Sequence, residues 1–416
     1  MDITQEEYRV AKQNGRIIHT KINILNFDFQ LVDEISGVVL DGSTYSIDAT
    51  SDIRRTCSIS LVPKDDTFNV EYGGKLWLDK YVQVFIGIED IKNSNKIIYS
   101  NLGLFMINNP EQVYDATNNT ITINGIDLMA KMTGLRNGYL EGITYQIDQY
   151  TGIKQAMTAL VRDECGFPNY SIDQPEPTIL TPNEMSFGLG SSAYNILTQL
   201  RDVNSNYQTY FDQNGIFWFN RIPSGEDEQI MVDDDIWEKV LISYKKSSDF
   251  ESVKNYIEVF GKTQDEGYQP TGSTETYYTP YGVAFEDNPE SPFYIGDNQE
   301  NKIRIVLSGG EYDNIFPIRN PNTGDIESLD DYNSLAQQRA DYELYTRCRL
   351  QDQIELTCVP VYWLDVNWLI RITLPNKQST HNEPQLYIIK KINTTLGVNG
   401  TQNITLMKYY PFYPAT

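Results

Sequence analysis

Two passages of the chain open with the same triplet and continue with the same alternation. Residues 77–89 read WLDKYVQVFIGIE, and residues 363–375 read WLDVNWLIRITLP. Counted from each tryptophan, the apolar side chains recur at equal offsets in both passages: Val82, Val84 and Ile86, then Trp368, Ile370 and Ile372. A period of two residues is typical of a β-strand. The repetition therefore predicts two related strands in distant parts of the chain.

The similarity extends beyond this strand. Residues 104–110 (LFMINNP) and 119–125 (NTITING) follow the first passage, and residues 386–392 (LYIIKKI) and 402–408 (QNITLMK) follow the second. Their spacings differ by a few residues, which hairpin loops absorb. A weaker match, residues 54–62 with 352–361, precedes them. We expect two similar antiparallel β-barrels, in which Trp77 overlays Trp363 and Ile121 overlays Ile404.

The pattern changes to helices and a hairpin between the two barrels. Residues 151–165 carry apolar side chains at helical spacing. Residues 191–206 do the same, with Ser191 or Ser192 as the N-cap. The apolar stripe of this second helix is Ala193, Ile196, Leu197, Leu200 and Val203. Asn214-Gly215 between aromatic runs predicts a β-hairpin, and residues 252–261 alternate like a final strand.

A polar stretch and a last helix precede the second barrel. Residues 263–300 are rich in Gly, Pro, Asp, Glu and Asn, which is typical of an arm or a long loop. Its aromatic residues Tyr277, Tyr278, Tyr281, Phe285 and Phe293 predict docking, either on their own chain or on a neighbouring one. Residues 334–350 predict the helix. The predicted organisation is an N-terminal arm (1–15), a first β-barrel (16–142), an α+β middle domain (143–261), a polar arm (262–300), and a helix with the second β-barrel (301–416).

Charge and composition restrict the function. The chain has 33 Lys and Arg against 57 Asp and Glu, a formal net charge of −24. Stable nucleic-acid binding requires basic surface and is therefore disfavoured. We expect no membrane anchor, because no run of 18 apolar residues occurs. The N-terminus lacks the features of a signal peptide, so synthesis in the cytoplasm is expected.

The search for chemistry-bearing groups gave weak candidates. Cys57, Cys165, Cys348 and Cys358 lack metal-ligand spacing, and the only histidines are His19 and His381, so free thiols and no metal site are expected. Residues 233–235 (Asp-Asp-Asp) could hold a cation or form a solvated loop. Residues 188–193 spell G-x-G-x-x-A without the apolar strand that a dinucleotide site needs. We therefore expect no enzyme, no cofactor and no catalytic residue.

The whole arrangement resembles the baseplate hub proteins of contractile phage tails and phage-tail-like bacteriocins, a tail hub or late-control-D-like family. Three stretches carry the resemblance: SSAYNILTQLRDVNSNYQTYFDQNGIFWF (191–219), SPFYIGD (291–297) and SLAQQRADYELYTRC (334–348). The resemblance implies a homotrimer whose six barrels form a ring with pseudo-six-fold symmetry. This ring would join the tail tube protein to the central spike protein and contact other baseplate proteins in the particle. Related architectures occur in non-contractile tails, so the tail type stays open.

Two other functions remain as alternatives. A glycan-binding baseplate protein would stack sugars on exposed aromatic rings, with Tyr277, Tyr278, Trp218 and Phe219 as the platform. Trp218 and Phe219 are neighbours on one strand, so at most one of them faces outward. A tail-associated peptidoglycan hydrolase would need a carboxylate pair that the sequence does not single out. The second barrel extends almost to Thr416, which favours a hub without an added enzyme domain.

Overall fold

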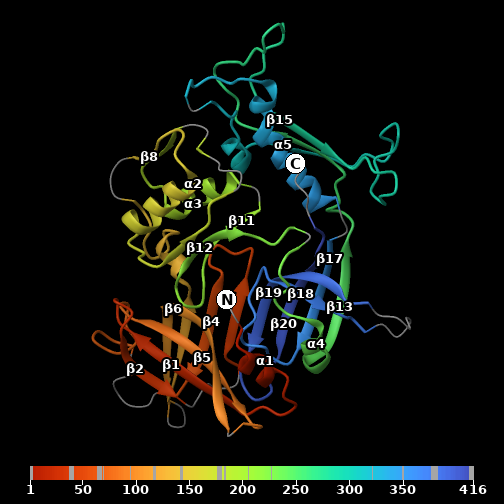
Figure 1. Ribbon diagram of the computed structural model, residues 1–416. Coiled ribbons are helices and arrows are strands. Elements are labelled where there is room, and N and C mark those ends of the chain that lie inside the picture. The colour runs from red at the N-terminus through yellow and green to blue at the C-terminus, as the bar shows by residue number, and fades with distance from the viewer. Residues whose placement is uncertain are drawn as a thin grey trace.

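The fold is mainly β, with a helix-and-hairpin insert in the middle of the chain (Figure 1). The computed structural model describes residues 3–36, 42–62, 68, 70–93, 95–115, 119–140, 144–175, 180–181, 184–204, 206–225, 227–320, 322–348, 351–375 and 383–411. Within these ranges the strands form one 12-stranded sheet, two 3-stranded sheets and one 2-stranded sheet. The predicted fold class is confirmed.

The large sheet takes its strands from both ends of the chain. The first group comprises β1 (Ile18–Leu25), β2 (Leu31–Ser36), β3 (Thr44–Asp48), β4 (Arg55–Leu61), β5 (Tyr81–Asp90), β6 (Lys96–Tyr114) and β7 (Asn119–Ile126). The second group comprises β13 (Leu241–Asp249), β17 (Gln351–Cys358), β18 (Leu369–Ile372), β19 (Gln385–Thr395) and β20 (Gln402–Lys408). As the alternation predicts, Val82, Val84 and Ile86 of β5 are buried.

The two groups pair their strands in the same order. The order is β3-β4-β7-β6-β5 in the first group and β13-β17-β20-β19-β18 in the second, with every pair antiparallel. The registers agree as well, since Ile121 of β7 faces Leu61 and Ile404 of β20 faces Leu356. This agreement supports the predicted duplication, while the superposition of the two groups stays a prediction.

The two tryptophans of the shared triplet do not occupy equal places in this repeat. β18 pairs Leu369, six residues after Trp363, with Ile388 of β19. β5 pairs Gln83, six residues after Trp77, with Leu104 of β6. When Ile121 is matched to Ile404, however, Ile388 corresponds to a residue four places beyond Leu104. The expectation that the tryptophans overlay is therefore wrong by four residues, because the strands that follow them pair with a different part of β6 and β19.

β3 and β19 join the two groups into one sheet. They pair antiparallel from Lys391↔Asp48 to Thr395↔Thr44. Ile47 and Ile392, which face each other at this junction, are both 0% exposed. One hydrophobic core extends through both groups, and Figure 1 shows their red-orange and blue strands side by side. The two predicted barrels therefore share a core.

The middle of the chain forms an α+β unit. Its elements are η1 (Leu128–Lys131), β8 (Tyr145–Ile147), α2 (Ile153–Thr158), η2 (Ala159–Glu164), β9 (Tyr170–Ile172), β10 (Met185–Phe187), α3 (Ala193–Asp202), β11 (Tyr207–Phe211) and β12 (Phe217–Arg221). Ser192 caps α3, because its side chain accepts a hydrogen bond from the Asn195 amide at 3.2 Å. β11 and β12 form the predicted hairpin, and Gly215 in its turn has a φ of +76°.

A further small unit differs from the predicted organisation. It contains β14 (Tyr256–Phe260), β15 (Tyr281–Phe285), β16 (Arg304–Leu307), η3 (Gly310–Asn314) and α5 (Leu329–Arg347). The sequence prediction assigned residues 252–261 to the middle domain and the helix to the second barrel. Instead, β14 pairs antiparallel with β15 and parallel with β16, and α5 packs on β14 and β15. Pairing across long loops leaves no local sequence pattern, which explains the difference.

The polar arm belongs to this small unit. Tyr268 and Tyr277 exchange backbone hydrogen bonds of 2.8 Å, and the Tyr268 ring stacks on Tyr332 of α5 with centroids 5.3 Å apart. Tyr332 donates its hydroxyl to the Tyr277 carbonyl at 3.0 Å. Of the aromatic residues for which the two docking alternatives were posed, Tyr277 therefore packs on its own chain.

Candidate functional site

The acidic run at residues 233–235 begins a helix and forms hydrogen bonds with distant segments of the chain. Asp233 is the N-cap of α4 (Asp234–Val240). Asp234 accepts a hydrogen bond from the Thr373 hydroxyl at 2.6 Å, and Asp235 accepts from Lys12 at 2.7 Å. Burial opposes the Asp235 charge, but hydrogen bonds from Lys12 and Tyr8 outweigh it and lower the pKa of this carboxyl. Each of the three carboxylates thus has a partner within the chain, since Asp233 also pairs with Arg371.

The remaining candidate residues are dispersed. His19 lies in β1 with its ring 3.3 Å from Glu89, and His381 lies outside the described residues. The cysteines are free, with Cys57 and Cys358 buried and the other two partly exposed. In the described ranges, no group of three His, Cys, Asp or Glu could hold a metal. No described helix is both long and apolar enough to cross a membrane.

The expectation that no strand precedes the glycine-rich turn before α3 is wrong. A strand does precede residues 188–193, namely β10, although the sequence gave no sign of it. It is three residues long and pairs antiparallel with β8 in a two-stranded sheet. A dinucleotide site requires a parallel strand leading into the helix. The turn therefore introduces the Ser192 cap and carries no dinucleotide-binding geometry.

The four aromatic residues of the glycan-binding alternative do not form one platform. Phe219 is 0% exposed and packs in the core of the middle unit. Trp218 is partly exposed and donates its indole N–H to Asp212 at 3.2 Å. Tyr277 packs near Tyr332 of the small unit, with ring centroids 6.4 Å apart. As predicted, only one of the two neighbours on β12 faces outward, but its proposed companions belong to another unit.

A buried ion pair lies where the two strand groups meet. Arg55 of β4 donates to Asp365, which belongs to the second WLD triplet, and their side chains are 2% and 11% exposed. Arg55 also donates to the Tyr45 hydroxyl of β3 at 3.1 Å. Burial opposes the Arg55 charge, yet Asp365 and Tyr45 outweigh it and raise its pKa. The ion pair therefore depends on both groups being in place.

The preceding residue extends these contacts to the middle unit. Arg54 donates to the Gln208 side chain of β11 at 2.7 Å, and its guanidinium lies 3.9 Å from the ring centroid of Tyr210. Asn367 donates to the same Gln208 oxygen at 2.6 Å. Burial lowers the pKa of the Arg54 guanidinium. A hydrogen bond and a cation–π contact thus stabilise this charge, and among the described residues no carboxylate forms an ion pair with it.

Asp127 completes the group on the side of η1. It accepts hydrogen bonds of 2.9 Å from the backbone amides of Arg55 and Met129. Burial nevertheless raises the pKa of this carboxyl to about 6, against these two bonds. Asp127 is 1% exposed and therefore caps η1 from inside the protein.

These residues together form what we call the polar junction: Tyr45, Arg54, Arg55, Asp127, Gln208, Tyr210, Asp365 and Asn367. The junction connects the first strand group, the second strand group and the middle unit through direct contacts between their side chains. These side chains hold neighbouring elements together through hydrogen bonds and an ion pair. None of these residues was predicted as a site residue from the sequence, although two adjacent arginines, Arg54 and Arg55, at the start of an apolar strand were a visible signal.

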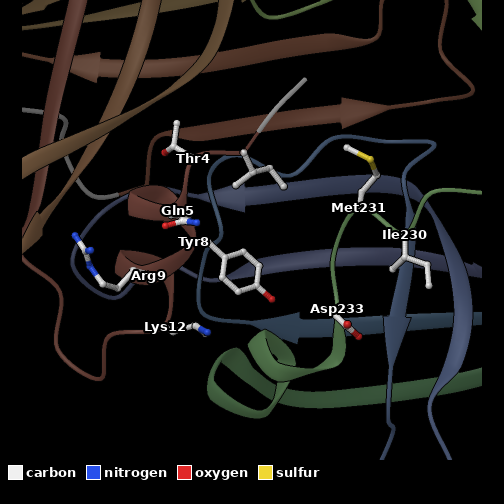
Figure 2. A pocket seen from close by; sticks show the side chains of 9 residues that line it. Thr4, Gln5, Tyr8, Arg9, Lys12, Ile230, Met231 and Asp233 are labelled. Carbon is white, nitrogen blue, oxygen red and sulfur yellow. The ribbon is translucent and has the colours of Figure 1, made fainter.

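α1 (Gln5–Ala11) packs on β5 and β6 of the first strand group, and its Tyr8 points toward the segment that carries Asp233 (Figure 2). Tyr8 stacks on Trp363 with ring centroids 5.8 Å apart and donates its hydroxyl to Asp235. A cavity of about 510 Å³ lies between α1 and the segment before α4. Its three charged lining residues are Arg9, Lys12 and Asp233, and each forms an ion pair within the chain.

Comparison with known proteins identifies the fold. Residues 290–413 match the model of a domain of unknown function (DUF5048). No curated protein sequence gives a significant match. A tail protein from Neisseria meningitidis has a similar structure, with a TM-score of 0.57, 7% identity, and coverage of 95% of this chain and 98% of that one. A prophage MuSo2 43 kDa tail protein from Shewanella oneidensis has a TM-score of 0.55 at 9% identity, with coverage of 93% of this chain and 98% of that one.

Two further comparisons agree. Prophage tail protein gp18 from Listeria monocytogenes gives a TM-score of 0.53 at 12% identity, covering 93% of this chain and 94% of that one. A chain of a Francisella PdpA–VgrG complex gives 0.53 at 10% identity, covering 99% of this chain but only 62% of that one. The chain thus has the fold of these phage tail proteins over nearly its whole length.

Proposed function

We propose that this chain is a structural baseplate hub subunit of a phage tail or phage-tail-like particle, and that it is not an enzyme. Three copies would form a ring that joins the tail tube to the central spike. The observation that carries the proposal is the repeated strand order, β3-β4-β7-β6-β5 and β13-β17-β20-β19-β18, within one chain. The fold that it shares with prophage tail proteins supports the same role.

The repeat explains why such a protein would contain two similar strand groups. A tube with six-fold symmetry and a spike with three-fold symmetry cannot contact one another equivalently through single-domain subunits. A trimer of a duplicated chain presents six similar groups on one face and keeps three-fold symmetry elsewhere. The polar junction and the shared core would hold the two groups of each chain at a fixed angle, as a ring requires.

The partners follow from this position. We propose contacts with the tail tube protein, the central spike protein and other baseplate proteins, and location in the virion or tail-like particle. The PdpA–VgrG complex that contains a chain of the same fold is consistent with assembly into larger machines.

The oligomeric state tests the proposal. We expect the full-length chain to have the mass of a trimer, alone or together with the tube and spike proteins from the same source. Native mass spectrometry measures the mass, and electron microscopy of the ring measures its symmetry. A chain that stays monomeric both alone and with these proteins would contradict the proposal.

The net charge gives a second expected result. A trimer carries a formal charge of 3 × −24 = −72, which opposes the binding of phosphates. We expect the purified protein not to retard duplex DNA in a gel at low salt, where weak electrostatic binding is strongest. Retention of DNA that disappears with added salt would instead indicate a concealed basic surface.

A further inference from the structure

The 12-stranded sheet ends at an exposed strand whose counterpart inside the chain is covered. β13 lies at the end of the sheet and pairs with β17. In the repeat, β13 corresponds to β3, because β13 pairs with β17 and β3 pairs with β4, the strand equivalent to β17. β3 pairs on its other side with β19, whereas the described strands place none on the other side of β13. Nearly all of β13 is exposed.

The second exposed edge is the C-terminal part of β6. β6 pairs with β5 only up to Met106 and with β7 as far as Tyr114. β6 corresponds to β19, and the part of β19 beyond β18 is the part that pairs with β3. Both strands also have a bulge at the start of this segment, after Asn108 in β6 and after Ile389 in β19. β6 therefore has an edge shaped like the one that β19 offers to β3.

We propose that β13 of one copy pairs antiparallel with residues 111–114 of β6 in the next copy, closing the ring through the same contact that joins β19 to β3 within each chain. The inference rests on the proposed trimeric ring and specifies its subunit interface. A head-to-tail contact of this kind closes into a ring when the rotation per contact divides a full turn. Edge strands that lack a partner are templates for such pairing.

The registers specify which residues face each other. Within the chain, Ile392 faces Ile47 and Asn393 faces Ser46. Ile392 faces Ile404, and Gln112 faces Ile121. Because Ile404 and Ile121 are equivalent in the repeat, Ile392 corresponds to Gln112. Ile47 corresponds to Phe250, the residue after Asp249.

Gln112 is therefore expected to face Phe250 across the interface, and Val113 to face Asp249. Phe250 is 72% exposed, although the corresponding Ile47 is 0% exposed. Val113 and Tyr114 are 46% and 80% exposed. Apolar side chains thus lie uncovered at both edges, as expected of surfaces that a second copy covers.

Disulfide trapping tests this pairing in the full-length chain. Cysteines at opposing positions of an antiparallel pair lie within the distance that a disulfide spans. In a background with Cys165 and Cys348 replaced by Ser, Gln112→Cys with Phe250→Cys should form covalent dimers and trimers on oxidation. Gln112→Cys with Ile242→Cys should not, because Ile242 lies eight residues before Phe250, at the other end of β13. Ser46→Cys with Asn393→Cys should link within one chain and serves as the positive control, since these two residues face each other at the in-chain junction.

Charge at the same positions gives an independent measurement. Both sites are exposed, so the variants should fold. Opposing Glu residues at 112 and 250 should weaken trimer association about fivefold per interface compared with Gln112→Lys/Phe250→Glu. A trimer without covalent links at Gln112→Cys/Phe250→Cys, and with equal association of the two charge variants, would overturn the strand pairing and leave the ring intact. A chain that forms no trimer at all would overturn the proposed function, and the strand pairing with it.

Discussion

Replacement of Asp365 by Ala is expected to lower the free energy of unfolding by about 3–5 kcal/mol. The change leaves Arg55 with a buried charge, since its side chain is 2% exposed and, among the described residues, Asp365 is the carboxylate that forms an ion pair with it. Arg54 lies beside it with a second buried guanidinium, so two positive charges would remain without a nearby anion other than Asp127. Urea denaturation followed by circular dichroism measures the loss.

The first WLD triplet supplies a matched control. Asp79 follows the same Trp-Leu pair, but its side chain is 53% exposed and pairs with Lys80 at the surface. Asp79→Ala should change the free energy of unfolding by less than about 0.5 kcal/mol. The double variant Arg55→Met/Asp365→Leu should lose less than the sum of its single changes, because it removes both charges together. Equal losses for Asp79→Ala and Asp365→Ala would show that the ion pair contributes little.

Leu197→Asp is expected to unfold the middle unit. Leu197 is 0% exposed and packs with Ile196, Leu200 and Phe211 in the core beneath α3. The change removes a buried apolar side chain and introduces a carboxylate without a partner, at a cost of several kcal/mol (~4 or more). We expect a large fall in melting temperature and faster proteolysis within residues 144–225.

Gln199→Ala is the control on the same helix. Gln199 lies two residues further along α3, on a partly exposed side. Ala favours the helix, so this variant should melt within a few degrees of the wild type. Equal melting temperatures for Leu197→Asp and Gln199→Ala would contradict the assignment of the buried face.

Short sequence patterns predicted individual strands and helices, because these elements depend on residues only a few positions apart. The alternation in residues 119–125 and 402–408 predicted β7 and β20, and helical spacing with a serine cap predicted α3. Asn214-Gly215 predicted the β11–β12 hairpin for the same reason. α5 began five residues earlier than predicted, because Ser328 accepts a hydrogen bond from the Asp331 amide at 3.0 Å and caps it there.

The sequence by itself thus determined the mainly β class, the duplicated order of strands and the apolar face of α3. These features depend on neighbours within a few residues, or on a pattern written twice. Only the tertiary structure decided that β3 pairs with β19, that β14 joins β15 and β16, and that Asp365 meets Arg55. Identical triplets received opposite surroundings, with Leu364 3% and Leu78 67% exposed. The physical reason is that burial and pairing between distant segments depend on which surfaces meet after folding, and a short sequence pattern is the same whichever surface covers it.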